Sequence, residues 1–349
     1  MIARVAESCF WLQRHVERFD NTARLVAINL ETLLDVELPA EERWRPLLVA
    51  AGEEERFLEL HGARACDDGE VIQEYLTWSE ENPVSILRSA HWARENARTI
   101  RETLSLEAWE SINRCWLWMS GGPGRRLYRR DRESFYEKVR QEALLFRGVC
   151  QETMPHDRPF DFLRLGTSLE RAGQIARTLD VKYQQMAPIH REEVYEGSDQ
   201  LTLWLALLRC SGTSEAFFKR GYPLDGKFVA GFMIFEPDHP RTILYNVERC
   251  RNFLERIRPP RGRGYASARL VLGLCQELRH ASVDEVLARG VARFLESLVG
   301  ALDLVGDSIR RDFFYAPPAD EESVVRRSES LLAEPAPAKA AAAGGRSGP

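Results

Sequence analysis

Two stretches of this chain, about half its length apart, carry the same pattern of charged residues. Residues 17–24 and residues 170–177 each begin with a Glu-Arg pair and end in arginine, and 153 positions separate Glu17 from Glu170. A glutamate beside arginines forms charge-assisted ion pairs, and an arginine without such a partner can bind a carboxylate or phosphate group. These two stretches, here called the Glu-Arg words, are therefore the first place to look for function.

The polar residues of each word share one face if the chain is helical there. At about 100° per residue, Glu17, Asn21 and Arg24 lie within about 60° of one another. The margins of this face hold Arg14 and Asp20. The corresponding face of the second word consists of Glu170, Gln174 and Arg177.

A third cluster of the same composition occurs between the two words. It consists of Arg94, Glu95, Asn96 and Arg98, and it lies on a predicted helix that Ser85 is placed to cap.

Three interpretations of these charged faces stay open. The first is a solvated helix surface with weak ion pairs. The second is a buried Glu–Arg network that holds helices together. The third is a binding site in which arginines hold an anionic ligand and the glutamates orient them. In an enzyme, Glu17 or Glu170 would act as general base while Arg24 or Arg177 held an anionic substrate.

Apolar periodicity predicts long helices that carry the words. From residue 5 to residue 33, apolar residues recur at alternating spacings of four and three, which is typical of one helix packing along a narrow seam. The same register recurs over residues 162–186. Two segments with mixed signals, residues 70–78 and 227–235, are predicted to be helical as well.

Two further blocks recur in the same order and indicate an internal duplication. A Trp-x-x-Leu-Leu motif begins at Trp44 and again at Trp204. A proline followed by Ser or Thr and then Ile-Leu begins at Pro83 and again at Pro240. We therefore predict an all-α helical bundle of two duplicated, pseudo-symmetric halves in one compact domain, residues 1–150 and 155–315. Residues 316–349 are rich in Pro and Ala and are predicted to form a disordered tail.

The composition predicts a soluble, cytoplasmic protein. The chain has 349 residues, of which 44% are hydrophobic, and a formal net charge of −5. No sustained basic face offsets the acids, so nucleic acid is not an expected partner. No apolar stretch is long enough to span a membrane, and the charged N-terminus does not resemble a signal peptide. Seven scattered cysteines without a Cys-x-x-Cys motif fit a reducing compartment.

The sequence lacks the common motifs for cofactor and metal chemistry. The glycine-rich residues 121–124 are not followed by the lysine of a Walker loop, and the seven histidines include no His-x-x-x-His pair. No Gly-x-Ser-x-Gly motif occurs. We expect no cofactor and no metal site.

Several stretches together resemble a known family. They are residues 5–24, 93–98, 145–149, 162–166 with 169–171, and 307–315. Across about residues 1–315 the chain resembles the bacterial alpha-E domain proteins, a helical family of unknown function named for a Glu-Arg motif. The second word departs from the family's usual one, because Gly173, Gln174 and Ile175 stand where an acidic residue and Asn-Thr are usual.

The resemblance implies a role beside another enzyme. Alpha-E proteins are typically encoded beside, or fused to, circularly permuted ATP-grasp ligases, often with a transglutaminase-like protease nearby. This implies an accessory or partner protein of a peptide- or amide-forming ligase system that presents or binds an anionic, peptide-like substrate through the Glu-Arg faces. A purely structural helical scaffold remains an alternative, as does the enzyme described above, and no catalytic residue is assigned. The candidate substrate- or partner-binding residues are Arg14, Glu17, Arg18, Asn21, Arg24, Arg94, Glu95, Asn96, Arg98, Arg164, Glu170, Arg171 and Arg177.

Overall fold

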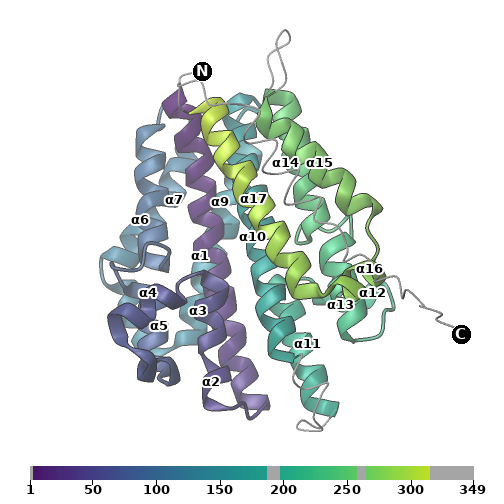
Figure 1. Cartoon of the computed structure of the whole chain (residues 1–349). Coiled ribbons are helices and arrows are strands. Elements are labelled where there is room, and N and C mark those ends of the chain that lie inside the picture. The colour runs from purple at the N-terminus through teal and green to yellow at the C-terminus, as the bar shows by residue number, and fades with distance from the viewer. Residues whose placement is uncertain (1–2, 187–196, 258–264, 315–349) are drawn as a thin grey trace, which may run out of the picture.

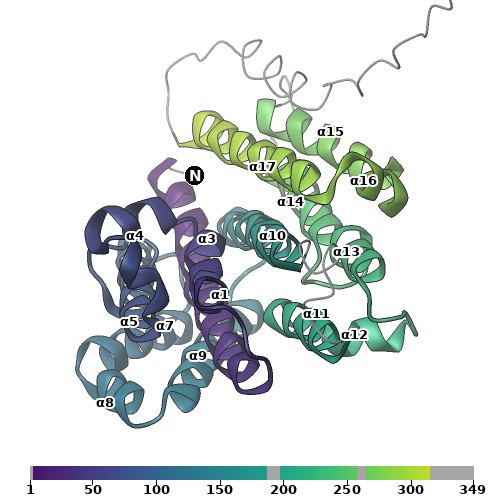
Figure 2. The same ribbon diagram turned by 60° about the horizontal axis from the view of Figure 1, so that its bottom comes forward.

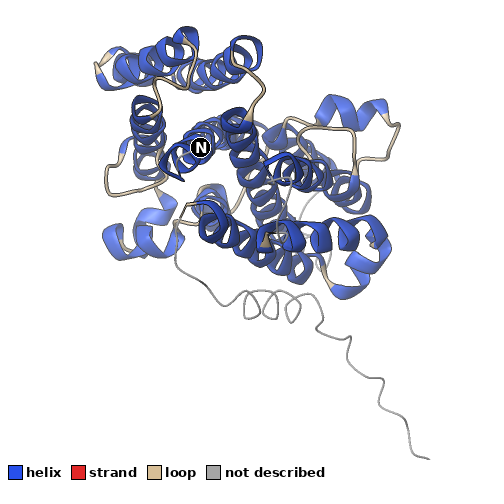
Figure 3. Ribbon diagram, turned by 90° about the horizontal axis from the view of Figure 1, so that it is seen from above, coloured by secondary structure: helices blue, strands red, loops and turns tan. Residues whose placement is uncertain are grey.

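The computed structural model describes residues 3–186, 197–257 and 265–314 of the chain. Within these ranges every regular element is a helix and no β-strand occurs (Figure 3). The predicted all-α class is therefore confirmed. The predicted tail, residues 316–349, lies outside the described residues.

The helices follow the chain in two series. The first series is α1 (Ala3–Asp35), α2 (Ala40–Arg43), α3 (Arg45–Ala51), α4 (Glu54–His61), the 3-10 helix η1 (Ala63–Asp67), α5 (Gly69–Trp78), α6 (Ile86–Thr99), α7 (Leu106–Ser120), α8 (Pro123–Arg130) and α9 (Arg132–Thr153). The second series is α10 (Arg158–Met186), α11 (Gly197–Ser211), α12 (Ser214–Lys219), α13 (Gly226–Phe235), α14 (Ile243–Ile257), α15 (Ala266–His280), α16 (Val283–Arg289) and α17 (Val291–Phe313). The two segments with mixed signals are helical, as predicted, and form α5 and α13.

Helices α1 and α10 lie side by side at the centre of the bundle (Figure 1). Helix α1 packs against α6, α9 and α10, while α10 packs against α1, α14 and α17. Each central helix carries one Glu-Arg word, and each contains the long periodic segment that the sequence predicts. The middle of the apolar seam is fully buried, since Leu12, Val16 and Phe19 of α1 and Leu165 of α10 expose no surface.

The surroundings of the two central helices follow the same plan. Helix α9 flanks α1 and helix α17 flanks α10, on opposite sides of the central pair (Figure 2). Each half also covers the central helix of the other half, because α3 packs against α10 and α11 packs against α1.

The two repeated tryptophans make equivalent contacts. A Cβ added to Gly69, at the start of α5, would lie 2.3 Å from the Cε2 atom of Trp44. A Cβ added to Gly226, at the start of α13, would lie 2.8 Å from the Cζ2 atom of Trp204. Both distances are well inside van der Waals contact, so each tryptophan ring needs a glycine beneath it.

A third glycine determines how closely the central helices approach. The backbone of α10 at Gly166 lies against the carbonyl group of Phe10 on α1, and a Cβ at Gly166 would lie 2.2 Å from that oxygen. Because the clash is with backbone, no side-chain rotation can relieve it. Gly166 therefore sets the separation at which the two Glu-Arg words face each other.

We predict that Gly166→Ala destabilises the fold by about 1–3 kcal/mol, because α10 must move away from α1. The matched control is Gly148→Ala on α9, where an added Cβ meets no atom within 4 Å. The control should stabilise by about 0.5–1 kcal/mol, since alanine favours the helix. Urea unfolding of both variants tests this, and equal stabilities would show that the close approach is unimportant.

Candidate functional site

The two Glu-Arg words face each other across the contact between α1 and α10. Their glutamates are buried, with Glu17 exposing 1% and Glu170 exposing 2% of its surface. The interpretation of these carboxylates as part of a solvated surface is therefore wrong.

Each glutamate pairs with the arginine of the opposite word. The Nε and Nη2 atoms of Arg171 donate to the two carboxylate oxygens of Glu17 at 2.6 and 2.8 Å. In return, Nε and Nη2 of Arg18 donate to the two oxygens of Glu170 at 2.6 and 3.2 Å. The two forks are reciprocal, so the words bind each other in place of forming two independent faces.

Further groups complete the coordination of Glu170. Nε of Arg14 donates to its Oε2 at 2.6 Å, and the side chain of Gln174 donates to its Oε1 at 3.1 Å. The guanidinium of Arg14 also lies over the ring of Trp11, 4.7 Å from the ring centroid.

A second buried carboxylate, Asp20, lies next to Glu17 and has no exposed surface. Arg147 of α9 donates from Nη2 to Asp20 at 2.6 Å and from Nη1 to Glu17 at 3.1 Å. Arg241, just before α14, donates to Asp20 at 3.0 Å. Arg24 approaches the other oxygen of Asp20 at 3.6 Å. Asp20 thus ties together helices from both halves of the chain.

The arginines keep these carboxylates ionised. Burial raises the pKa of Glu170, but Arg18 and Arg14 lower it by more, so it lies well below its usual range. Burial also raises the pKa of Asp20, but Arg147 and Arg241 lower it by more, so this pKa too lies well below its usual range. The pKa of Glu17 is lowered by Arg171 and Arg147 against the effect of burial. Carboxylates with lowered pKa values are weak bases, which argues against the role of general base.

Positive charge is in excess around Glu17 and Asp20. Seven buried or half-buried arginines, here called the arginine cluster, gather where α1, α9, α10 and α14 meet: Arg24, Arg140, Arg147, Arg164, Arg171, Arg241 and Arg249. In the described part of the chain, the only carboxylates within ion-pairing distance of these seven are Glu17 and Asp20.

The excess affects the arginines themselves. Burial and the neighbouring Arg171 and Arg249 lower the pKa of Arg164. Burial lowers the pKa of Arg241 to about 10 although Asp20 is close. The Nε atoms of Arg24, Arg140 and Arg249 are buried without a hydrogen-bond partner among the described residues. Donors without acceptors in a positive environment favour the binding of an anion.

The structure separates the predicted site residues into three groups. The central network contains Arg14, Glu17, Arg18, Glu170 and Arg171, and the arginine cluster adds Arg24 and Arg164. Half-buried Asn21 lies on α1 beside them, and half-buried Arg177 lines a cleft between α10 and α17. Glu17 shares a helix face with Asn21 and Arg24, but its hydrogen bonds come from arginines of α9 and α10.

The third cluster forms a separate local network. Ser85 caps α6 as predicted, accepting a hydrogen bond from the Arg88 amide at 3.2 Å. On that helix Glu95 pairs with Arg94 and with Arg98. Arg94 also bonds to Asn113 of α7, whereas the side chain of Asn96 donates to the carbonyl of Trp92. These partners lie on α6 and α7, away from the facing words.

Sequence reasoning did not select four members of the arginine cluster, namely Arg140, Arg147, Arg241 and Arg249. Weak signals for three of them exist. Arg147 lies within the family-like residues 145–149, Arg241 lies in the repeated proline block, and Arg249 follows a further glutamate. None of these signals identifies the buried partner.

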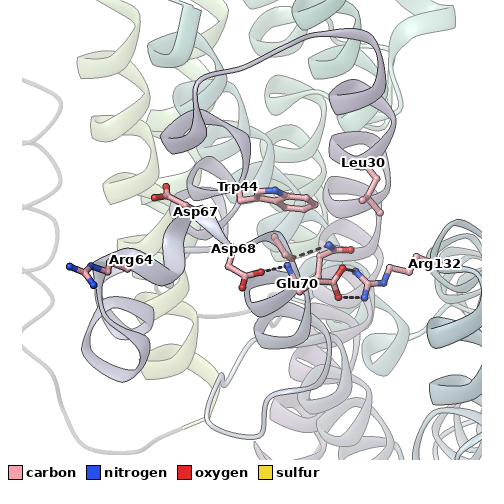
Figure 4. A pocket seen from close by; sticks show the side chains of 9 residues that line it. Leu30, Trp44, Arg64, Asp67, Asp68, Glu70 and Arg132 are labelled. Atoms are coloured by element: carbon pink, nitrogen blue, oxygen red, sulfur yellow. Dashed lines mark hydrogen bonds and ion pairs between the residues drawn. The ribbon is translucent and has the colours of Figure 1, made fainter.

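A wide surface cleft of about 840 Å³ lies elsewhere, between Trp44 and the start of α5 (Figure 4). Two of its acidic residues, Asp68 and Glu70, already have local partners. Asp68 caps α5 by accepting the amide of Glu70 at 2.9 Å, and Glu70 forms a two-pronged ion pair with Arg132. These carboxylates stabilise helix ends and neighbouring helices, so the cleft is not the preferred site.

Comparison with known proteins supports the family suggested by the sequence. A family described as a predicted alpha-helical domain with a conserved ER motif, alpha-E, matches residues 1–314. The chain belongs to the alpha-E family. The Glu-Arg pairs that face each other in this structure give a physical setting for such a motif.

Related proteins occur in mycobacteria. Uncharacterised proteins of Mycobacterium bovis and Mycobacterium tuberculosis are each 25% identical to this chain over 331 residues, covering 87% of this chain and 36% of the relative. The chain therefore spans about a third of the length of these curated relatives. No solved structure matches the chain. None of the helices in the described ranges combines the length and apolar character needed to cross a membrane.

We predict that the central network stabilises the protein less as the pH falls. The pKa of Glu170 is lower in the folded than in the unfolded chain, so its contribution is present above the ordinary value of 4.5 and is lost as the pH falls below it. Glu170→Gln should cost roughly 3 kcal/mol at neutral pH, because buried arginines lose their partner. The difference in the free energy of unfolding between this variant and wild type should become smaller as the pH falls toward about 3.5.

The control for this experiment is Glu137→Gln on the exposed face of α9, whose side chain bonds only to Gln141 in the described structure. Its effect on the free energy of unfolding should be near zero at both pH values. An effect of Glu170→Gln that does not change with pH would contradict the assignment of Glu170 as a buried, ionised partner.

Proposed function

We propose that this protein is a non-catalytic partner of an amide-forming ligase of the ATP-grasp type and holds an anionic, peptide-like substrate on its arginine cluster. The observation that carries the proposal is the imbalance of seven arginines against two carboxylates at the junction of α1, α9, α10 and α14.

The chemistry of the arginine cluster favours binding over acid–base catalysis. Glu17 and Asp20 are fully engaged by arginines and have lowered pKa values, so they orient guanidinium groups and do not readily accept a proton. The remaining arginines supply planar donor groups that match carboxylate geometry. The partly desolvated setting strengthens attraction to a ligand carboxylate compared with open solvent.

The ligase partner is proposed from the family. Alpha-E proteins are typically encoded beside, or fused to, circularly permuted ATP-grasp ligases, and the relatives have about two thirds of their length outside the region that this chain matches. That extra length is sufficient for a further domain. A transglutaminase-like protease is a second proposed partner. The proposed setting is the cytoplasm, where all seven buried cysteines would remain reduced.

We also infer that residues 1–150 and 155–315 arose by duplication of one helical unit. Three parallels support this: the shared apolar register of α1 and α10, the matching tryptophan–glycine contacts, and the equivalent flanking helices α9 and α17. Duplication explains why each word binds the other, since a pairing between two identical units would be reciprocal by symmetry.

A structural scaffold without a ligand is the second candidate. It is favoured by the burial of Glu17, Asp20 and Glu170, which could serve only to hold the halves together. It gives no role to Arg140, which forms no ion pair with any described residue. It gives Arg249 only a stacking contact over the ring of Phe253, 4.6 Å from the ring centroid.

We predict that the protein co-purifies with the ATP-grasp ligase encoded nearest to it and raises the ligase's substrate-dependent ATP turnover. The double variant Arg140→Gln and Arg249→Gln should keep its melting temperature and its association with the ligase, because neither side chain belongs to the ion-paired network. Turnover should fall about tenfold at subsaturating substrate, as expected for loss of charge-assisted bonds.

The matched control changes Arg129 and Arg130, two exposed arginines of α8, to glutamine. This variant should behave like wild type. Absence of association would remove the ligase from the proposal, and equal turnover of the two double variants would favour the scaffold.

A further inference from the structure

A cleft of about 310 Å³ lies where α17 meets α10 and α1, on the opposite side of the central pair from α9. Two glycines leave this space open. A Cβ at Gly173 would meet Nη1 of Arg177 at 3.4 Å, and a Cβ at Gly306 would meet Leu169 at 3.5 Å. The volume lies at the small end of the range for ligand sites and suits a molecule the size of an amino acid or dipeptide.

The charged groups of the cleft include one cation and one anion that form no close ion pair. Glu170 is engaged by Arg14 and Arg18, and Asp307 lies 3.5 Å from Arg310 on its own helix. Arg177 on α10 and Asp303 on α17 also line the cleft. Within the described ranges, neither Arg177 nor Asp303 forms an ion pair or side-chain hydrogen bond.

We propose that this cleft binds a small zwitterion, an α-amino acid or short peptide, with its carboxylate on Arg177 and its ammonium group on Asp303. Burial raises the pKa of Asp303 and Arg177 is close enough to lower it against this effect, but the two side chains form no ion pair. A ligand of this kind supplies one charge to each wall and so bridges the two groups. A guanidinium can bind a carboxylate through two parallel hydrogen bonds. A carboxylate can accept two or more hydrogen bonds from an ammonium group.

The rest of the cleft suits such a ligand. The ring of Trp11 supplies an apolar wall, while Arg14 is held by Glu170 and by stacking over that ring. The buried Glu170 is already neutralised, so it does not repel the ligand carboxylate. The cleft volume of about 310 Å³ favours a ligand with a small side chain.

The first half of the chain carries a different residue at the position equivalent to Gly173. At the offset of 153 residues, Gly173 corresponds to Asp20. Asp20 and its partner Arg147 fill the position on the α9 side with a buried ion pair. Gly173, where the second word departs from the usual alpha-E pattern, therefore lines a cavity, whereas Asp20 at the equivalent position of the first word forms a salt bridge. This inference extends the proposed function to a second site, but it does not require the ligase.

The test measures binding of L-alanyl-L-alanine to the full chain by NMR titration, in parallel with the dipeptide's C-terminal amide and its N-acetyl derivative. Wild type should bind the free dipeptide at least about tenfold more tightly than either capped form, because each cap removes one charge-assisted contact. Arg177→Gln should lose the discrimination against the amide only. Asp303→Asn should lose the discrimination against the acetylated form only.

Arg129→Gln serves as the control and should retain both preferences. Absence of saturable binding of the free dipeptide, equal binding of the three ligands, or variants that lose both preferences together would overturn the proposal. The assay contains no ligase, so failure to associate with a ligase and failure of this cleft to bind are separate results. Binding that is lost on Arg140→Gln with Arg249→Gln, and not on Arg177→Gln, would place the ligand on the arginine cluster and also overturn the proposal.

Discussion

The structure depends on the reciprocal exchange of Glu–Arg pairs between α1 and α10. A carboxylate as buried as Glu17 or Glu170 is costly unless a cation is held against it with good geometry. Each glutamate receives a two-pronged pair from an arginine of the other half of the chain, and Arg147 of α9 adds a further contact to Glu17. Both carboxylates are therefore fully paired only when α1 and α10 are docked. The apolar seam supplies most of the driving force for docking the two helices, but its spacing recurs at every turn and so is compatible with several registers. The charged pairs, together with the close approach at Gly166, select one of these registers.

The same motif produces different surroundings on the two sides of the central pair. On the α9 side, Asp20, Arg147 and Arg241 continue the ion-paired network, and further arginines gather around it. On the α17 side, Gly173 ends the network and leaves a cleft with Arg177 on its wall. Docking of the two central helices uses Glu17, Arg18, Glu170 and Arg171 from both words. Positions beside the words are free to differ, and the proposed binding sites arise there.

Much of the fold could be predicted from the sequence because its signals are local. The periodic apolar residues identify α1 and α10, and Ser85 marks the start of α6. The pairing could not be predicted, because a helical wheel compares residues of one helix. It placed Arg24 with Glu17, whereas the partners of Glu17 are 130 and 154 residues away. The cluster around Glu95 has the same composition as the words and yet pairs locally, so composition alone does not reveal burial. The two-halved organisation and the ligase partnership stay predictions.

The most direct test of the central claim is a double-mutant cycle between Glu17 and Arg171, using Glu17→Gln, Arg171→Met and the double variant in urea unfolding. If the two side chains form a buried pair across α1 and α10, the cycle should give a favourable coupling free energy of roughly 2 kcal/mol. The double variant would then be destabilised by much less than the sum of the two single changes. A coupling below about 0.5 kcal/mol would mean that the two substitutions act independently, and the reciprocal pairing would not be what holds the two words together.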